Sequence, residues 1–217
     1  MSISLGSTNF GSLYLGSTKI GEAYLGSVKV YGSTPPDPYN PLNLPPYTIR
    51  LKFNNGVTPT FSYGTAVQVS SSPNVWDLTY QNSNWQYLVS SQTRLIEVLG
   101  ANTSSVTVMD DMFAGCDELT SLSLFDTSAV TNMKNMFYQC TSLTSVPLFN
   151  TRSATDVVSM FYGCENVESG SLSLYQQMST QAVPPSATDY CFTNCGSNTV
   201  TGQAELAQIP SSWGGLG

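Results

Sequence analysis

A repeat of 24 residues constrains the fold of this chain more than any other feature of its sequence. The pattern Met-x-x-Met-Phe-x-x-Cys-x-x-Leu begins at Met109 and again at Met133. A third unit begins at Val157, and a fourth, which holds Phe192 and Cys195, is displaced by seven extra residues. A single unit of this size cannot bury its own apolar face, whereas stacked units bury a continuous column. The repeat therefore predicts stacked units with like residues above one another.

Each unit is expected to contribute one short strand, over residues 119–124 and 143–148 in the first two units. A helical or irregular turn at Met-Phe-x-x-Cys is expected on the opposite side. Residues 95–107 match a half-unit that leads into the first full unit. Two columns should form along the stack, one of phenylalanines and one of cysteines: Phe113, Phe137, Phe161 and Phe192, and Cys116, Cys140, Cys164 and Cys195.

These units resemble BspA-type leucine-rich repeats, which are also seen in surface lipoproteins of the mycoplasma type. The resemblance rests on Met-Phe-x-x-Cys-x-x-Leu and covers residues 95–197. A period of 24 lies within the range of about 20–29 residues for leucine-rich repeats. The resemblance implies a leucine-rich-repeat solenoid and a role in adhesion or recognition, because family members are mostly surface-exposed interaction proteins.

A second repeat, of ten residues, occupies the N-terminus, where Leu-Gly-Ser recurs at Leu5, Leu15 and Leu25. Ten residues fit one strand and a two-residue turn, and Gly-Ser suits a type II′ hairpin. We expect a β-meander over residues 1–31, which is too small to bury a core alone. It either packs on the rest of the chain or mediates association of copies and docking on a larger assembly. The residues expected to serve assembly and anchoring are Leu5, Tyr14, Leu15, Tyr24, Leu25 and Tyr31.

Half of the twelve prolines lie in residues 32–47, which predicts an extended spacer or, as an alternative, a Pro-rich ligand. The ten-residue repeats with this linker resemble N-terminal segments of virion proteins from phages of Bacteroidetes. The ending at residues 203–215 resembles the endings of similar proteins.

Asn54-Asn55-Gly56 predicts a hairpin within a segment, 48–94, that caps the solenoid of residues 95–217. The expected fold class is mainly β with short helical turns.

Composition excludes several function classes. The chain has 7 basic and 14 acidic residues, and the acidic ones are concentrated after residue 95, which argues against nucleic-acid binding. Histidine, the commonest general base, is absent. No apolar run of about 18 residues is present, so no membrane span is expected. The first residues have no basic or apolar region of a signal peptide.

Three groups of side chains could carry chemistry, and packing or solvation is the preferred interpretation of each. The repeated cysteines are expected as buried thiols, with a disulfide (most plausibly Cys191 with Cys195) or a metal as alternatives. The methionines are expected in the core rather than in a binding stripe. Asp110-Asp111 and Asp117-Glu118 are expected in solvated turns, with a bound cation or catalysis as alternatives. No catalytic residue, metal ligand or cofactor is predicted.

The sequence favours a non-enzymatic structural protein of a bacteriophage virion, either a head or tail fibre or a capsid decoration protein. The N-terminal repeats would anchor it to other virion proteins, in a homo-oligomer for which a trimer is one option. The solenoid would bind a host surface glycan or protein. The candidate recognition surface comprises Ser121, Ser123, Thr144 and Ser145. Alternatives are a bacterial cell-surface adhesin of BspA type and, on the acidic residues alone, a glycan-active enzyme.

Overall fold

The computed structural model describes residues 13–15, 18–20, 23–25, 28–31 and 39–217, the first four segments by their backbone only. The chain divides into two compact units, Met1–Asp37 and Pro38–Gly217. Each unit is described by itself below.

The first unit contains two β-hairpins. Strand β1 (Leu13–Leu15) pairs antiparallel with β2 (Thr18–Ile20), and β3 (Ala23–Leu25) pairs antiparallel with β4 (Val28–Tyr31). Each pair is a separate two-stranded sheet, so the described residues form two hairpins instead of one continuous meander. The strands are three or four residues long, too short for the continuous ladder that the ten-residue period predicted. The anchoring residue Leu5, and the side chains of Tyr14, Leu15, Tyr24, Leu25 and Tyr31, lie outside what the structure describes.

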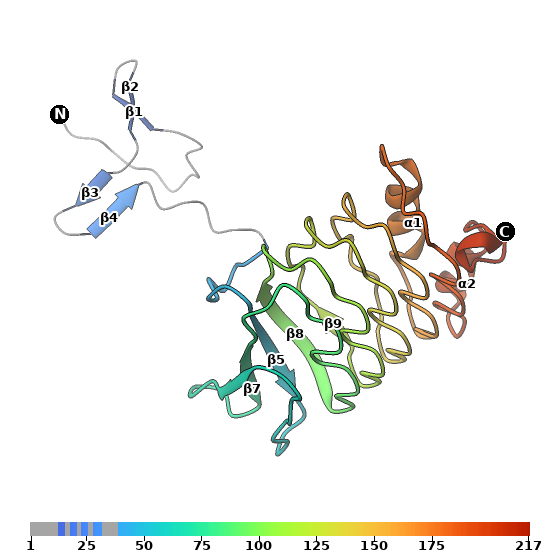
Figure 1. The fold of residues 1–217 in the computed structure, drawn as a ribbon, viewed down its shortest axis with the longest axis horizontal. Helices are drawn as coiled ribbons and strands as arrows, with labels where there is room; N and C mark the ends of the chain where they lie inside the picture. Colours follow the sequence, from blue (N-terminus) through green and yellow to red (C-terminus); the bar gives the residue numbers. More distant parts are fainter. Residues whose placement is uncertain (1–12, 16–17, 21–22, 26–27, 32–38) are drawn as a thin grey trace. The chain divides into compact units, whose positions relative to one another are not determined.

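The second unit begins with a five-stranded mixed sheet in the order β6-β7-β5-β8-β9 (Figure 1). Its strands are β5 (Thr48–Phe53), β6 (Thr65–Gln68), β7 (Val75–Thr79), β8 (Leu95–Asn102) and β9 (Ser121–Leu122). The central strand β5 is antiparallel to β7 and β8, and β8 is parallel to β9. The sheet therefore changes from antiparallel to parallel pairing where the repeats begin.

Most side chains of β5 alternate between the core and the outer face. Ile49, Leu51 and Phe53 are buried. Arg50 and Lys52 lie on the outer face, where they pair with Asp77 and Glu97 on the neighbouring strands.

The predicted hairpin between residues 48–53 and 57–61 is wrong. The turn exists, with φ 78° at Gly56 and a hydrogen bond from the Val57 N–H to the Asn54 carbonyl oxygen. Residues 57–61 form no strand, and β5 pairs with β7 and β8 instead. Pro59 explains this outcome, because proline cannot donate the hydrogen bond that a ladder needs.

The second half of the predicted linker belongs to the folded second unit. Leu44 is buried, and its N–H donates to Asn40 Oδ1 at 2.8 Å. The Tyr47 N–H donates to the Asn102 carbonyl oxygen at 3.1 Å. The predicted extended spacer is therefore wrong for residues 39–47, where burial of Leu44 holds the chain against the sheet.

Beyond the sheet, the repeat units stack in register (Figure 1). Isolated parallel bridges join Val108 to Asn132 and Asn132 to Asp156, so each unit pairs 24 residues along the chain. The next bridge joins Asp156 to Ala187 and confirms the displacement by seven residues. The ten-residue helix α1 (Ser171–Thr180) lies within this displaced unit.

The predicted phenylalanine column is confirmed. The ring centroids of Phe113 and Phe137 lie 5.3 Å apart, those of Phe137 and Phe161 5.1 Å, and those of Phe161 and Phe192 6.0 Å, with interplanar angles of 10° or less. All four side chains are fully buried. The methionines of the repeats, Met109, Met112, Met133, Met136 and Met160, are fully buried beside them, as predicted.

The strands of the repeats are shorter than predicted. Of residues 119–124 only β9 is a strand, and residues 143–148 contribute the single bridge between Ser145 and Ser169. Leu124 and Leu148 are 41% and 54% exposed. Pro147 accounts for the shorter second segment, because it has no N–H for the ladder. The turns at Met-Phe-x-x-Cys are irregular rather than helical, with a left-handed residue in each unit, such as Asp111 and Asn135.

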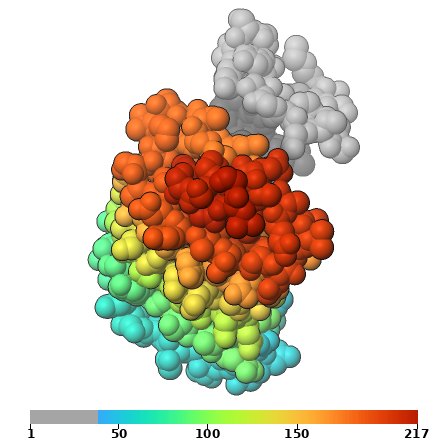
Figure 2. All heavy atoms as spheres, turned by 90° about the vertical axis from the view of Figure 1, so that its right-hand side faces the viewer, coloured from blue at the N-terminus to red at the C-terminus, as the bar shows by residue number. Residues whose placement is uncertain are grey.

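The stack begins one unit earlier than the predicted boundary at residue 95. Asn84 bridges to Val108, and Trp85, Leu88 and Val89 are buried at the positions that Met109, Met112 and Phe113 occupy in the next unit. At the other end lie α2 (Val200–Leu206) and the 3-10 turn Ser211–Trp213. Figure 2 shows these C-terminal residues covering the end of the stack. Within the described residues, no helix is long and apolar enough to cross a membrane.

Candidate functional site

The four predicted recognition residues lie together on one face of the stack, on the strand side of two neighbouring units. Ser121 belongs to β9 and pairs with Glu97 of β8, and Ser145 bridges to Ser169. Ser121, Thr144 and Ser145 are exposed, and Ser123 is half-buried. We call this surface the hydroxyl face; it comprises Thr120, Ser121, Ser123, Thr144, Ser145 and Ser169.

The threonines and the serines of the hydroxyl face differ in their hydrogen bonds. Thr120 Oγ1 donates to the Ile96 carbonyl oxygen at 2.9 Å, and Thr144 Oγ1 donates to the Thr120 carbonyl oxygen at 3.3 Å. Within the described part of the chain, the hydroxyls of Ser121 and Ser145 make no side-chain hydrogen bond. The threonines therefore link the units, whereas these two serines can bond to a ligand or to water.

Charged residues border the hydroxyl face but do not interrupt it. At one end Lys52 Nζ lies 2.9 Å from Glu97 Oε2, and Arg50 Nε lies 2.6 Å from Asp77 Oδ1. These partly exposed pairs neutralise one another and contribute little to stability. The six members of the hydroxyl face are small and uncharged.

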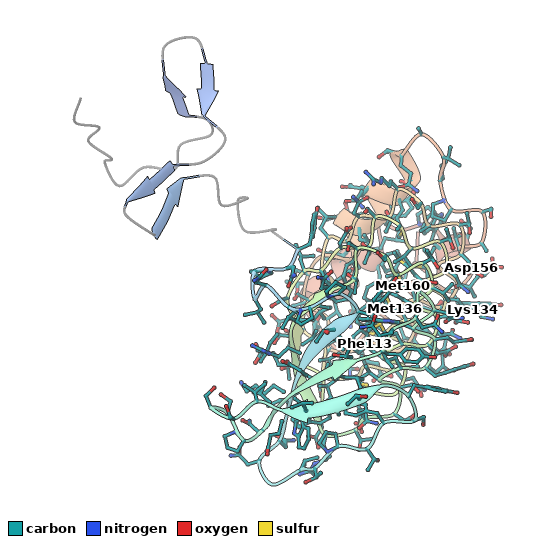
Figure 3. All side chains as sticks on the ribbon, turned by 60° about the vertical axis from the view of Figure 1, so that its left-hand side comes forward. Phe113, Lys134, Met136, Asp156 and Met160 are labelled. Carbon is teal, nitrogen blue, oxygen red and sulfur yellow. The ribbon has the colours of Figure 1, made fainter. Side chains whose placement is uncertain are left out.

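The opposite, turn side of the stack carries ionisable side chains. Figure 3 shows Lys134 and Asp156 at the surface, with Met136, Met160 and Phe113 inside. Gln86 Nε2 donates to Asp110 Oδ2 at 2.7 Å. Burial raises the pKa of Asp110 to about 6. A hydrogen bond with Asp111 and the negative charge of Asp111 also raise this pKa, whereas the positive charge of Lys134 lowers it. Asp110 therefore titrates closer to neutrality than an ordinary carboxylate.

Of the second predicted acidic pair, Asp117 is exposed, whereas the Glu118 side chain contacts other residues of the protein. Glu118 accepts a hydrogen bond from Asn54 Nδ2, and its Oε1 lies 3.8 Å from Arg94 Nη1. Among the described residues, no three His, Cys, Asp or Glu side chains gather where they could hold a metal ion.

The five cysteines are buried free thiols, which confirms the preferred interpretation of the repeated cysteines. Cys191 and Cys195, the most plausible candidates for a disulfide, are not bonded. The Sγ atoms of Cys140 and Cys164 donate to the carbonyl oxygens of Phe113 and Phe137 at 3.2 Å and 3.1 Å. Each of these two cysteines thus links its unit to the one before it.

Two cavities lie near the C-terminal end, and neither was predicted. A cavity of about 470 Å³ is lined by the last unit and the C-terminal segment. A second, of about 410 Å³, lies between α1 and the unit that holds Leu148 and Arg152. Both depend on segments that the 24-residue pattern does not describe, so the repeat alone gave no signal for them.

Comparison with known protein families places most of the second unit in a described family. A family model described as "Mycoplasma protein of unknown function, DUF285" matches residues 65–183, which are 119 of the 217 residues. The match runs from β6 through α1 and includes the stacked units between them. No curated protein matches, and no solved structure matches.

Proposed function

The chain belongs to the family described as "Mycoplasma protein of unknown function, DUF285", and we propose that it is a bacteriophage virion protein whose stacked units are a BspA-type leucine-rich-repeat solenoid for surface recognition. The parallel bridges at 24-residue spacing support the solenoid. In a leucine-rich repeat each unit likewise adds one short strand to a continuous face.

The observation that carries the recognition role is the hydroxyl face. Its exposed serines, Ser121 and Ser145, hold equivalent positions in successive units, 24 residues apart, and its six members are uncharged. Such a surface suits docking of a host glycan or a polar protein surface, because its hydroxyls both donate and accept hydrogen bonds. Binding to these six residues also does not require the removal of water from a charged side chain.

The first unit supports the anchoring role. Its two hairpins have only three or four residues in each strand, and isolated two-stranded sheets are at best marginally stable in water. A second copy of the chain, or another virion protein, would complete such sheets. We therefore assign assembly to this unit, through Leu5, Tyr14, Leu15, Tyr24, Leu25 and Tyr31.

A cell-surface adhesin of BspA type is the alternative function. The same hydroxyl face supports it, because adhesion and host recognition make equal demands on that surface. An export signal encoded upstream of Met1 would favour the adhesin over the virion protein.

Light scattering tests the assembly role. We expect the full chain to be a defined oligomer and a chain that begins at Pro38, the start of the second unit, to be a monomer. Circular dichroism of the shortened chain controls for its folding. A full chain that is monomeric at the same concentration would contradict self-association. The first unit would then have to bind a different protein of the virion.

A further inference from the structure

The cavity of about 470 Å³ at the C-terminal end is an open hollow of the size of a small-molecule site. Its lining includes Tyr190, Asn194, Ser197, Gln203, Ser211 and Leu216. Its volume lies within the range of about 300–1,000 Å³ that is typical of small-molecule sites. It lies between the last unit and the C-terminal segment.

The C-terminal segment forms one wall by taking the place of a further repeat unit. The Phe192 N–H donates to the Trp213 carbonyl oxygen at 2.9 Å, as the Phe161 N–H donates to the Cys191 carbonyl oxygen at 2.8 Å. The following glycine, Gly214, has φ 85°, and a Cβ there would lie 2.3 Å from Thr193 Oγ1. Only glycine permits this close approach, so the wall is held in a fixed position.

The lining combines an aromatic ring with neutral polar groups. Tyr190 is 61% exposed, and Leu216 adds exposed apolar surface, whereas Leu206 is buried. Amide and hydroxyl groups come from Asn194, Gln203 and the two serines. None of the lining residues is Asp, Glu, Lys or Arg, although the whole chain carries a net charge of −7.

We propose that this pocket binds a neutral sugar. Sugar hydroxyls donate and accept hydrogen bonds, and so do amide and hydroxyl side chains. The C–H groups of a sugar ring can contact the electron-rich face of an aromatic ring such as that of Tyr190. An anionic ligand would find no cation in the lining. Gln203 Nε2 donates to the Ser197 carbonyl oxygen at 2.7 Å, so a purely apolar ligand would leave chiefly the Asn194 amide and the serine hydroxyls without a partner.

The proposal does not depend on the virion role, because sugar binding is measured on the isolated full chain. The chain also offers a matched control for Tyr190. Tyr87 holds the equivalent position in the repeat unit that begins at Asn84. Tyr87 has φ 57° and is 52% exposed, and Tyr190 has φ 59° and is 61% exposed. Tyr87 does not line the pocket. Its substitution therefore removes an equivalent exposed ring without changing the pocket.

The test is saturation-transfer NMR with the full chain and four probes at about 10 mM, a concentration that detects millimolar dissociation constants. The neutral probes are methyl α-glucoside, methyl β-galactoside and N-acetylglucosamine, and the anionic probe is glucuronate. We expect at least one neutral probe to bind and glucuronate not to bind. Tyr190→Ala should weaken binding about tenfold, which corresponds to the loss of one aromatic contact. Tyr190→Phe and Tyr87→Ala should bind as the unchanged chain does.

A second variant keeps the test decisive if Tyr190→Ala does not fold. Asn194 has φ 59°, which glycine adopts without strain, so Asn194→Gly removes the amide and retains the backbone. We expect it to weaken binding severalfold. The proposal would be overturned if no neutral probe binds, if glucuronate binds as well as they do, or if Tyr87→Ala weakens binding as much as Tyr190→Ala.

Discussion

At the scale of single residues, the cysteine column shows why one small side chain recurs in the units that follow Val108. Burial raises the pKa of Cys116 and Cys164 to about 12, and it raises the pKa of Cys140 well above its ordinary value. Each of these thiols also donates a hydrogen bond to a carbonyl oxygen of the preceding unit. The position therefore combines apolar packing with a donor for a buried carbonyl.

We expect these thiols to be unreactive in the folded protein. The thiolate is the reactive species, and both burial and the raised pKa suppress it at pH 8. A colorimetric disulfide reagent should therefore find no rapidly reacting thiol in the native chain and five in guanidinium chloride. Ser105→Cys, which places a thiol at an exposed position, should add one rapid equivalent. A rapid native reaction without that substitution would contradict the buried column.

At the scale of elements, α1 takes its N-terminal cap from another helix. Gly170 precedes the helix and supplies no capping side chain. Instead Glu205 of α2 accepts hydrogen bonds from the Gly170 N–H at 3.2 Å, the Leu172 N–H at 3.1 Å and Ser171 Oγ at 2.6 Å. A carboxylate at this end also interacts favourably with the helix dipole. Glu205 therefore connects the displaced unit to the C-terminal segment.

Removing the charge of Glu205 should lower the free energy of unfolding. We expect Glu205→Gln to cost about 1 kcal/mol and Glu205→Ala about 1–3 kcal/mol, because the N–H groups of α1 lose a charged acceptor. Urea denaturation measures both values. Glu168→Gln is the matched control, since Glu168 is exposed and its side chain makes no hydrogen bond or ion pair in the described part of the chain. Equal stability of Glu205→Gln and the control would show that the cap contributes nothing.

At the scale of the whole molecule, the repeat predicted the core and missed what surrounds it. Phe113 and Phe137 could be placed from the sequence because a fixed period also fixes which residues stack. The unit that begins at Asn84 was missed because Trp85 and Val89 replace the expected methionine and phenylalanine, although the apolar spacing is the same. The apolar spacing was therefore the signal from which this unit could have been predicted.

The sheet and the pocket could not be predicted in the same way. β5 pairs with strands that are distant in sequence, and the Asn-Gly turn that follows it indicates only a reversal of the chain, not its partner. The pocket depends on the close approach of Gly214 to Thr193, a contact between segments that no repeat relates. The recognition role of Ser121, Ser123, Thr144 and Ser145 stays a prediction; the period itself relates only Ser121 to Ser145.

The register of the stack leads to a prediction for the stability of residues 38–217 as a whole. Deleting residues 133–156 removes one complete unit and joins Asn132 to Val157, so that Asn132 takes the place of Asp156 in the bridge to Ala187. Phe113 can then stack on Phe161. Because stability in a repeat protein depends on contacts between neighbouring units, we expect the shortened chain to fold with a lower melting temperature.

Deleting residues 133–144 removes half a unit, places polar residues in the core and should abolish cooperative melting. Circular dichroism compares the two, and similar melting of both would show that the 24-residue register does not hold the stack together.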